Sequence, residues 1–213
     1  MTSSATSSRV PTMKPERVVR DVSNLPTIAF GSQSIAWWGT IGFMVIEGFT
    51  LALCAATYFY LRRNFSAWPP EQTPRPTLLI PIIQLGVMLV SIIPMYLAAR
   101  AAYRLDRSGM LKWLLVEVVF KIVILVLRWY GFKALNTQWN SDAYGSIVWT
   151  TLGLHTTLLV IDAAEDIGLV IIILTKMRDR LFSDVTDDAI YWYFTVAAWV
   201  PLFFMLFLTP YVS

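Results

Sequence analysis

The residues of this chain that could do chemistry inside a membrane are ionisable side chains set in long apolar segments. The stretch "HTTLLVIDAAEDIGLV" carries three acids within five positions and the only histidine of the chain. A charge near the centre of a bilayer costs several kcal/mol, so such residues usually face protein and find a partner. A metal site, a proton path and a contact between helices are the three uses to weigh. The ionisable residues within apolar segments are Glu47, Glu117, Lys121, His155, Asp162, Glu165 and Asp166.

A metal site is the least favoured of these uses. Carboxylate-bridged di-iron bundles need Glu-x-x-His pairs on two helices, and the sequence contains no such pair. His155 and Asp162 are separated by about 10 Å along a helix axis. One histidine and one cysteine also cannot build a multi-histidine haem–copper centre or a dinuclear copper site. We therefore expect no haem, no copper, no other metal and no catalytic residue in this chain.

The acids and the lysine are predicted to form one layer near the middle of the membrane. Glu47, Lys121 and Glu165 each lie about 15 Å from the same side of the membrane, at about 1.5 Å per helical residue. Glu117 precedes Lys121 by four residues and suits a local ion pair. The acids of "DAAED" share a helix face in part, so we expect Lys121 to bridge to them or to Glu47. Because acids outnumber bases, at least one carboxyl group should be protonated. Three roles for this layer stay open: a structural cluster of polar side chains that joins helices, a proton-related site, and a contact with another subunit.

The elements that position these residues are predicted to be long apolar helices. The chain has 213 residues, of which 56% are hydrophobic and 15% charged, and its mean hydropathy is +0.58. A soluble domain of this size would be far more polar. The fold class is therefore an all-α polytopic membrane protein. A polar tail, 1–33, precedes a membrane domain, 34–213, whose five segments are each long enough to cross roughly 30 Å of hydrocarbon. They are predicted at about 34–61, 77–99, 110–135, 145–175 and 190–212.

Basic residues predict the orientation of these segments. Eleven Lys and Arg residues flank one side of the membrane and five, Arg128 among them, flank the other. Because basic residues favour the cytosolic side, we expect the N-terminus in the cytosol and the C-terminus in the periplasm. Aromatic and basic residues near segment ends suit lipid headgroups or subunit interfaces. The residues expected to make such contacts are Trp37, Trp38, Tyr58, Tyr60, Arg62, Arg63, Trp192 and Trp199.

Four stretches in the same order resemble the cytochrome c oxidase subunit III family, that is, haem–copper oxidase subunit III. "WWGTIGFMVIEGFTLALCAATYFYLRRN" resembles the family's third helix, and Glu47 matches its mid-helix glutamate. "AWPP" with "PRPTLLIPIIQLGVMLVSIIPMYLAARAA" resembles the next loop and helix. "WNSDAYGSIVWTTLGLHTTLLVIDAAEDIGLV" is similar to the sixth helix, whose first histidine His155 matches, and "YWYFTVAAWVPLFFMLFLTPYV" resembles the closing helix. Typical members have seven helices, and short bacterial members are similar to the last five alone.

The chain departs from this family in the motifs that usually carry further polar side chains. Tyr193 stands where the closing motif usually has a histidine, and Val196 stands where it usually has an aspartate. Leu158 occupies the place of a second histidine in the sixth helix. The roles of those family side chains therefore do not carry over, and the chain is identified as a divergent five-helix member.

The resemblance implies an accessory role in aerobic respiration. Subunit III of these oxidases holds no haem or copper, packs beside catalytic subunit I in a complex that includes subunit II, binds phospholipid and helps proton uptake. A bacterial member would be a multi-pass, non-catalytic subunit of an electron-transport and proton-translocating complex in the inner membrane. Haem and copper would lie in partner subunits, and nucleic acid is not an expected partner. A similar subunit of a quinol oxidase or a nitric oxide reductase complex is equally compatible with these residues. A small proton-coupled transporter is less favoured because the chain shows no internal repeat.

Overall fold

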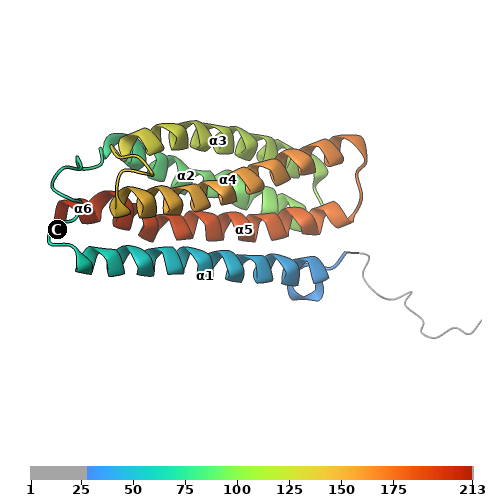
Figure 1. Ribbon diagram of the computed structural model, residues 1–213. Coiled ribbons are helices and arrows are strands. Elements are labelled where there is room, and N and C mark those ends of the chain that lie inside the picture. Colours follow the sequence, from blue (N-terminus) through green and yellow to red (C-terminus); the bar gives the residue numbers. More distant parts are fainter. Residues whose placement is uncertain (1–27, 213) are drawn as a thin grey trace, which may run out of the picture.

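Residues 28–212 are described by the computed structural model, and they contain helices but no strand. The short turns are a 3-10 helix, η1 (Gly31–Gln33), a π-helix, η2 (Phe204–Leu208), and a final helix, α6 (Thr209–Val212). Most of the predicted polar tail, 1–33, lies outside the described residues. The five long helices run up and down side by side (Figure 1): α1 (Ile35–Asn64), α2 (Leu79–Tyr103), α3 (Arg107–Ala134), α4 (Ala143–Thr175) and α5 (Arg180–Phe203).

The helices support the predicted membrane class. By length and composition, α1, α2 and the continuous run from α5 to α6 are apolar enough to cross a membrane. Helices α3 and α4 have 28 and 33 residues, so they are also long enough, but they contain ionisable residues. Within residues 28–212, an all-helical fold with three helices apolar enough to span a membrane is therefore confirmed. The count of five spans and the orientation of the termini stay predictions.

Local sequence explains where α3 and α4 begin and end. The side chain of Asp106 accepts a hydrogen bond from the backbone N–H of Gly109, and that of Asp142 accepts one from Gly145. Such caps satisfy the free N–H groups of a first helical turn. Gly145 has no room for a side chain, because a Cβ atom there would clash with the carbonyl oxygen of Gln138. Asn136 has a φ of 53° just beyond α3, the left-handed conformation that ends many helices.

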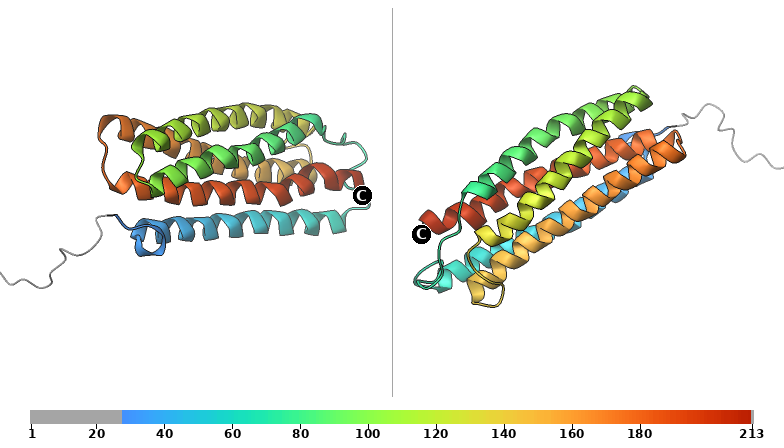
Figure 2. Two further views of the ribbon diagram at one scale, coloured as in Figure 1. Left: turned by 180° about the vertical axis from the view of Figure 1, so that it is seen from behind. Right: turned by 90° about the horizontal axis from the view of Figure 1, so that it is seen from above.

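Helix α1 is set apart from a core made by the other four helices. Helix α2 packs on α3 and α5, α3 packs on α4, and α1 packs mainly on α4 and α5. Figure 1 and the left view of Figure 2 show α1 along one side of this bundle. In its most apolar stretch only 6% of α1 is buried, compared with 39% for α2. The exposed apolar surface of α1 therefore needs lipid or another protein to cover it.

The two ends of the bundle are distinguished by the helix termini that lie there. Helix α1 begins at the end that we call the tail end, where α2 meets α3 and α4 meets α5. At the tail end, an Arg107 nitrogen (Nη2) donates to the carbonyl oxygen of Ile173 at 2.6 Å, which joins α3 to α4. At the opposite end, the Tyr211 hydroxyl donates to the carbonyl oxygen of Pro76 at 2.6 Å. The last helical residues are thereby tied to the segment that leads into α2.

Helix α5 begins ten residues earlier than the predicted span at 190. The segment before position 190 is rich in charge, which hides its helical pattern in the sequence. Leu181, Val185, Ala189 and Trp192 recur every three or four positions, and all four are buried. This spacing is typical of a helix that packs one face against a core. Because α5 begins earlier than predicted, further acidic residues lie within the helical bundle.

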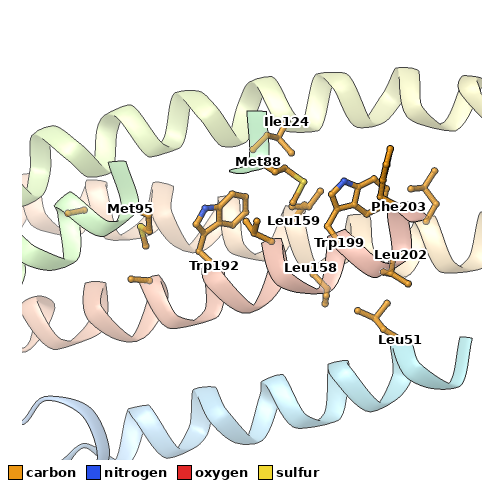
Figure 3. Close-up of a cluster of buried hydrophobic side chains, with 14 of the residues drawn as sticks. Leu51, Met88, Met95, Ile124, Leu158, Leu159, Trp192, Trp199, Leu202 and Phe203 are labelled. Carbon is orange, nitrogen blue, oxygen red and sulfur yellow. The ribbon is translucent and has the colours of Figure 1, made fainter. Parts of the chain in front are cut away.

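Three residues predicted to contact lipid or partners lie in the core instead. Trp192, Trp199 and Tyr58 are each 0% exposed. The two tryptophans are seven residues apart, so they share the inner face of α5, and Figure 3 shows both projecting into the bundle interior. Tyr58 packs against Trp68 of the following connection, with ring centres 5.4 Å apart.

The other predicted contact residues are placed at the surface of the chain. Trp38 is 60% exposed and Tyr60 is 69% exposed. Arg63 is also exposed, and Trp37 and Arg62 are half-buried. Their contact with lipid or with a partner stays a prediction.

Candidate functional site

Lys121 meets two of the acids that the sequence predicts to lie level with it. The Lys121 ammonium nitrogen lies 2.6 Å from a carboxylate oxygen of Asp162 and 2.5 Å from one of Asp166. It also lies 4.7 Å from the centre of the Trp192 ring, a cation–π contact. Lys121 is 1% exposed and both aspartates are 0% exposed. We call these four residues the lysine layer; α3, α4 and α5 contribute to it.

The surroundings of the lysine layer are also polar. The Trp192 indole N–H donates to the Ser91 hydroxyl of α2 at 3.1 Å, so four helices meet here. Glu117, one turn before Lys121, is fully buried, and neither of its carboxylate oxygens has a hydrogen-bond partner within residues 28–212. Asp188 of α5 is 2% exposed and contacts the carboxyl group of Asp166. The predicted local ion pair between Glu117 and Lys121 is wrong, because Lys121 points across to α4.

Two acids that are predicted to lie level with Lys121 do not pair with it. The Glu47 carboxylate accepts a hydrogen bond from the Tyr191 hydroxyl at 2.9 Å, so it joins α1 to α5 and does not pair with Lys121. Glu165 is an exposed residue of α4. The helical spacing explains this, because Asp162 and Asp166 are one turn apart on the inner face whereas Glu165 lies to the side.

A second buried cation lies two turns along α3, at Arg128. This residue is 1% exposed. One of its terminal nitrogens, Nη2, donates to Nδ1 of His155 at 3.1 Å, and its guanidinium carbon lies 3.8 Å from the centre of the Trp199 ring. The side-chain amide of Gln84 in α2 makes the most hydrogen bonds when it is turned so that its oxygen faces Arg128. That oxygen then accepts a hydrogen bond from Nε of Arg128 at 2.9 Å. We call these four residues the arginine layer.

The partners of His155 define its protonation. Arginine only donates hydrogen bonds, so Nδ1 must accept from Arg128. The other ring nitrogen, Nε2, lies 3.0 Å from the carbonyl oxygen of Thr195, so Nε2 must carry the proton and donate it. His155 is therefore a neutral, hydrogen-bonded histidine. It packs on Trp199 with ring centres 5.0 Å apart.

Sequence reasoning missed the arginine layer because it counted Arg128 among the residues that flank the membrane. A signal was available, since Arg128 follows Lys121 by seven residues and residues seven apart share a helix face. The same spacing separates Asp162 from His155, Trp192 from Trp199 and Ser91 from Gln84. The bundle thus repeats one arrangement at two levels about 10 Å apart.

The arrangement can hold charge and join helices. No group of three His, Cys, Asp or Glu side chains in residues 28–212 is placed to hold a metal ion. The fold and the two layers together define a multi-pass helical membrane protein whose helices are joined by buried cations.

Comparison with known proteins shows which proteins the chain is similar to. No protein-family model matches the chain. Cytochrome c oxidase subunit 3 of Synechocystis sp. is 24% identical over 186 residues, which cover 84% of this chain and 77% of that protein. Cytochrome c oxidase subunit 3 of Thermostichus vulcanus is 24% identical over 178 residues, or 80% of this chain and 85% of that protein. A probable cytochrome c oxidase subunit 3 of Nocardia farcinica is 26% identical over 173 residues, or 78% and 83%.

These similarities support the family that the four sequence stretches predict: over about four-fifths of its length the chain is similar to cytochrome c oxidase subunit 3 proteins.

Proposed function

We propose that this chain is a non-catalytic accessory subunit of a respiratory haem–copper terminal oxidase. The observation that carries the proposal is the similarity to three cytochrome c oxidase subunit 3 proteins over about four-fifths of the chain. The complex would transfer electrons to oxygen and translocate protons, with haem and copper held by its partner subunits. The names of these relatives favour cytochrome c over quinol as the electron donor.

The interior of the bundle suits a supporting subunit. Both buried cations bind side chains from other helices of this chain, so each layer holds helices together. Helix α1, with its large exposed apolar surface, offers a face on which subunit I could pack. The subunit would stabilise subunit I through such a contact, in a multi-pass arrangement in the bacterial inner membrane.

The acids near the tail end support a role in proton uptake. Carboxyl groups run from Asp184 near the start of α5, through Asp187 and Asp188, to Asp166 beside Lys121. Carboxyl groups in such a line bind and release protons. They would keep exchangeable protons next to the partner subunit during turnover.

A groove near the opposite end supports lipid binding. It lies between α3 and α4 and has a volume of about 790 Å³. Trp129, Phe132 and Trp149 give it apolar walls, and Lys133 lies at its edge. An ammonium group beside aromatic side chains suits a phospholipid whose phosphate sits at the membrane surface.

Changing Glu47 tests the accessory role. In the native complex, Glu47→Ala should leave the rate of haem reduction unchanged, while the chain dissociates more readily or oxygen consumption decays sooner during turnover. Ala56→Ser, at an exposed position on the same helix, is the control and should behave like the native chain. Loss of haem reduction in Glu47→Ala would overturn the accessory role. Oxidation of quinol but not of cytochrome c would move the chain to a quinol oxidase.

A further inference from the structure

Glu165 is an ionisable side chain exposed where a lipid-facing helix surface is expected. It lies ten residues before the end of α4, which places it about 15 Å into the helix. Its neighbours Asp162 and Asp166 are fully buried, but Glu165 is exposed and forms no hydrogen bond or ion pair with residues 28–212. A carboxylate facing hydrocarbon at this depth is strongly unfavourable. Protein from outside the chain is therefore expected to cover it.

Glu165 lies at a crevice between three helices. The crevice has a volume of about 50 Å³, which is too small for a helix but large enough for the end of a side chain. Helices α1, α4 and α5 all contribute to its wall, which is formed by Thr40, Phe43, Ile161, Glu165, Asp188 and Tyr191.

The crevice has an excess of acids without donors. Asp188 lines it, is 2% exposed, and neither of its carboxylate oxygens has a hydrogen-bond donor. Its charged neighbours are Lys121, which is already bound by two aspartates, and the carboxyl group of Asp166, which is another acceptor when ionised. The cations nearby are already engaged: Lys121 is bound by two aspartates, and Arg180 lies at the exposed rim, 3.5 Å from Asp184.

The surface beside Glu165 allows another helix to approach closely. Ala164 is exposed, and Gly168, one turn further along α4, is half-buried with nothing within 4 Å of where a Cβ would lie. Small residues four positions apart let helix backbones come close in a membrane. Phe43 and Ile161, which are 43% and 41% exposed, supply apolar surface next to them.

We propose that this crevice receives a lysine or arginine side chain from a transmembrane helix of a partner subunit. The inference rests on the proposed role in a complex and adds the docking face and the chemistry of the partner. A long basic side chain supplies the missing positive charge and donors, and its head fits the small volume. Glu165 lies inside the span predicted at about 145–175, where the neighbouring elements of a partner subunit are transmembrane helices.

Charge variants at Glu165 test the proposal in the native complex. Glu165→Lys should reduce the amount of partner retained through purification by about tenfold or more, and Glu165→Gln should reduce it less, because an unpaired buried charge speeds dissociation. Ile167→Gln is the matched control: it is 41% exposed, two residues away on another face of α4, and should retain the partner. Native retention of every partner subunit by Glu165→Lys overturns the proposal.

Photocrosslinking gives a second test that does not depend on folding of the charge variants. Ile161 is replaced by p-benzoylphenylalanine, the membranes are irradiated, and the adduct is sequenced by mass spectrometry. We expect an adduct with a transmembrane peptide that has Lys or Arg within one helical turn. Adducts only with lipid, with residues 1–27 of this chain, or with a peptide lacking such a residue overturn the docking site. If the unmodified chain co-purifies with no haem-bearing subunit, the proposed function itself fails.

Discussion

The lysine layer and the arginine layer place similar cations in similar surroundings and satisfy them in different ways. Both cations come from α3, seven residues apart, and each lies over an indole ring of α5, at 4.7 Å for Lys121 and 3.8 Å for Arg128. In the lysine layer, α4 supplies two carboxylates. In the arginine layer, α4 supplies a neutral imidazole and α2 an amide.

The difference follows from the chemistry of the two side chains. An ammonium group is a compact, strongly hydrated point charge, so burying it requires opposite charges close by. A guanidinium spreads its charge over a plane with five donors and stacks on aromatic rings, so neutral acceptors and a π face hold it. The lysine layer should therefore depend on charge balance, and the arginine layer on hydrogen-bond geometry.

The largest effect is expected when the lysine layer loses its cation. Lys121→Met leaves Asp162 and Asp166 facing each other without a counter-charge, and should lower the free energy of unfolding by about 3–5 kcal/mol. Thermal unfolding of the purified chain in detergent measures this. Lys112→Met is the control, since Lys112 is exposed on the same helix. Equal melting temperatures for the two variants would show that the ion pairs contribute nothing.

A smaller loss is expected when the arginine layer loses its cation. Arg128→Met leaves only neutral groups, His155 and Gln84, without a donor, which should cost about 1–3 kcal/mol. The same unfolding experiment applies. A loss as large as that of Lys121→Met would contradict the distinction between the layers. Arg128→Lys should not restore stability fully, because an ammonium cannot serve both acceptors in the plane of the guanidinium.

The contact between α1 and α5 gives a third, weaker effect. Tyr191→Phe removes the hydroxyl that donates to Glu47 at 2.9 Å, and should lower stability by about 1 kcal/mol. Tyr130→Phe is the control because Tyr130 is 47% exposed on α3. If Tyr191→Phe unfolds at the same temperature as this control, the hydrogen bond does not hold α1 to the bundle.

The smallest effect is expected at Glu117. Its carboxylate oxygens have no hydrogen-bond partner within residues 28–212, so Glu117→Gln should change stability by less than about 1 kcal/mol. Asp162→Asn, which removes a carboxylate bound to Lys121, should cost clearly more. If the order is reversed, Glu117 and not Asp162 provides the main counter-charge of the lysine layer.

The sequence predicted that Lys121 lies level with the acids of α4, but not which of them it meets. Counting residues from segment ends placed Lys121 level with the acids of α4, because the rise of a helix is constant. Which acid meets Lys121 depends on how α4 is rotated, and rotation is decided by packing against neighbouring helices. The sequence pattern therefore could not separate Asp166, which is buried, from Glu165, which is exposed.

Other errors came from treating charge as a sign of the surface. Charge predicts a position outside the membrane layer for Arg128 and before the last span for Asp188, but both are buried. Trp192 and Trp199 were assigned to the lipid interface because aromatic residues gather there. In this bundle their ring faces instead contact the buried cations, a role that is visible only when α3 and α5 are seen together.

The most direct test of the proposed function is the composition of the native assembly. The chain would carry an affinity tag and be purified from membranes in mild detergent. Native mass spectrometry and a reduced-minus-oxidised haem spectrum would then be recorded on the same sample. We expect a stable complex with a larger, haem-containing subunit. A chain that purifies alone, or only with proteins that contain no haem, would contradict its role as a terminal oxidase subunit.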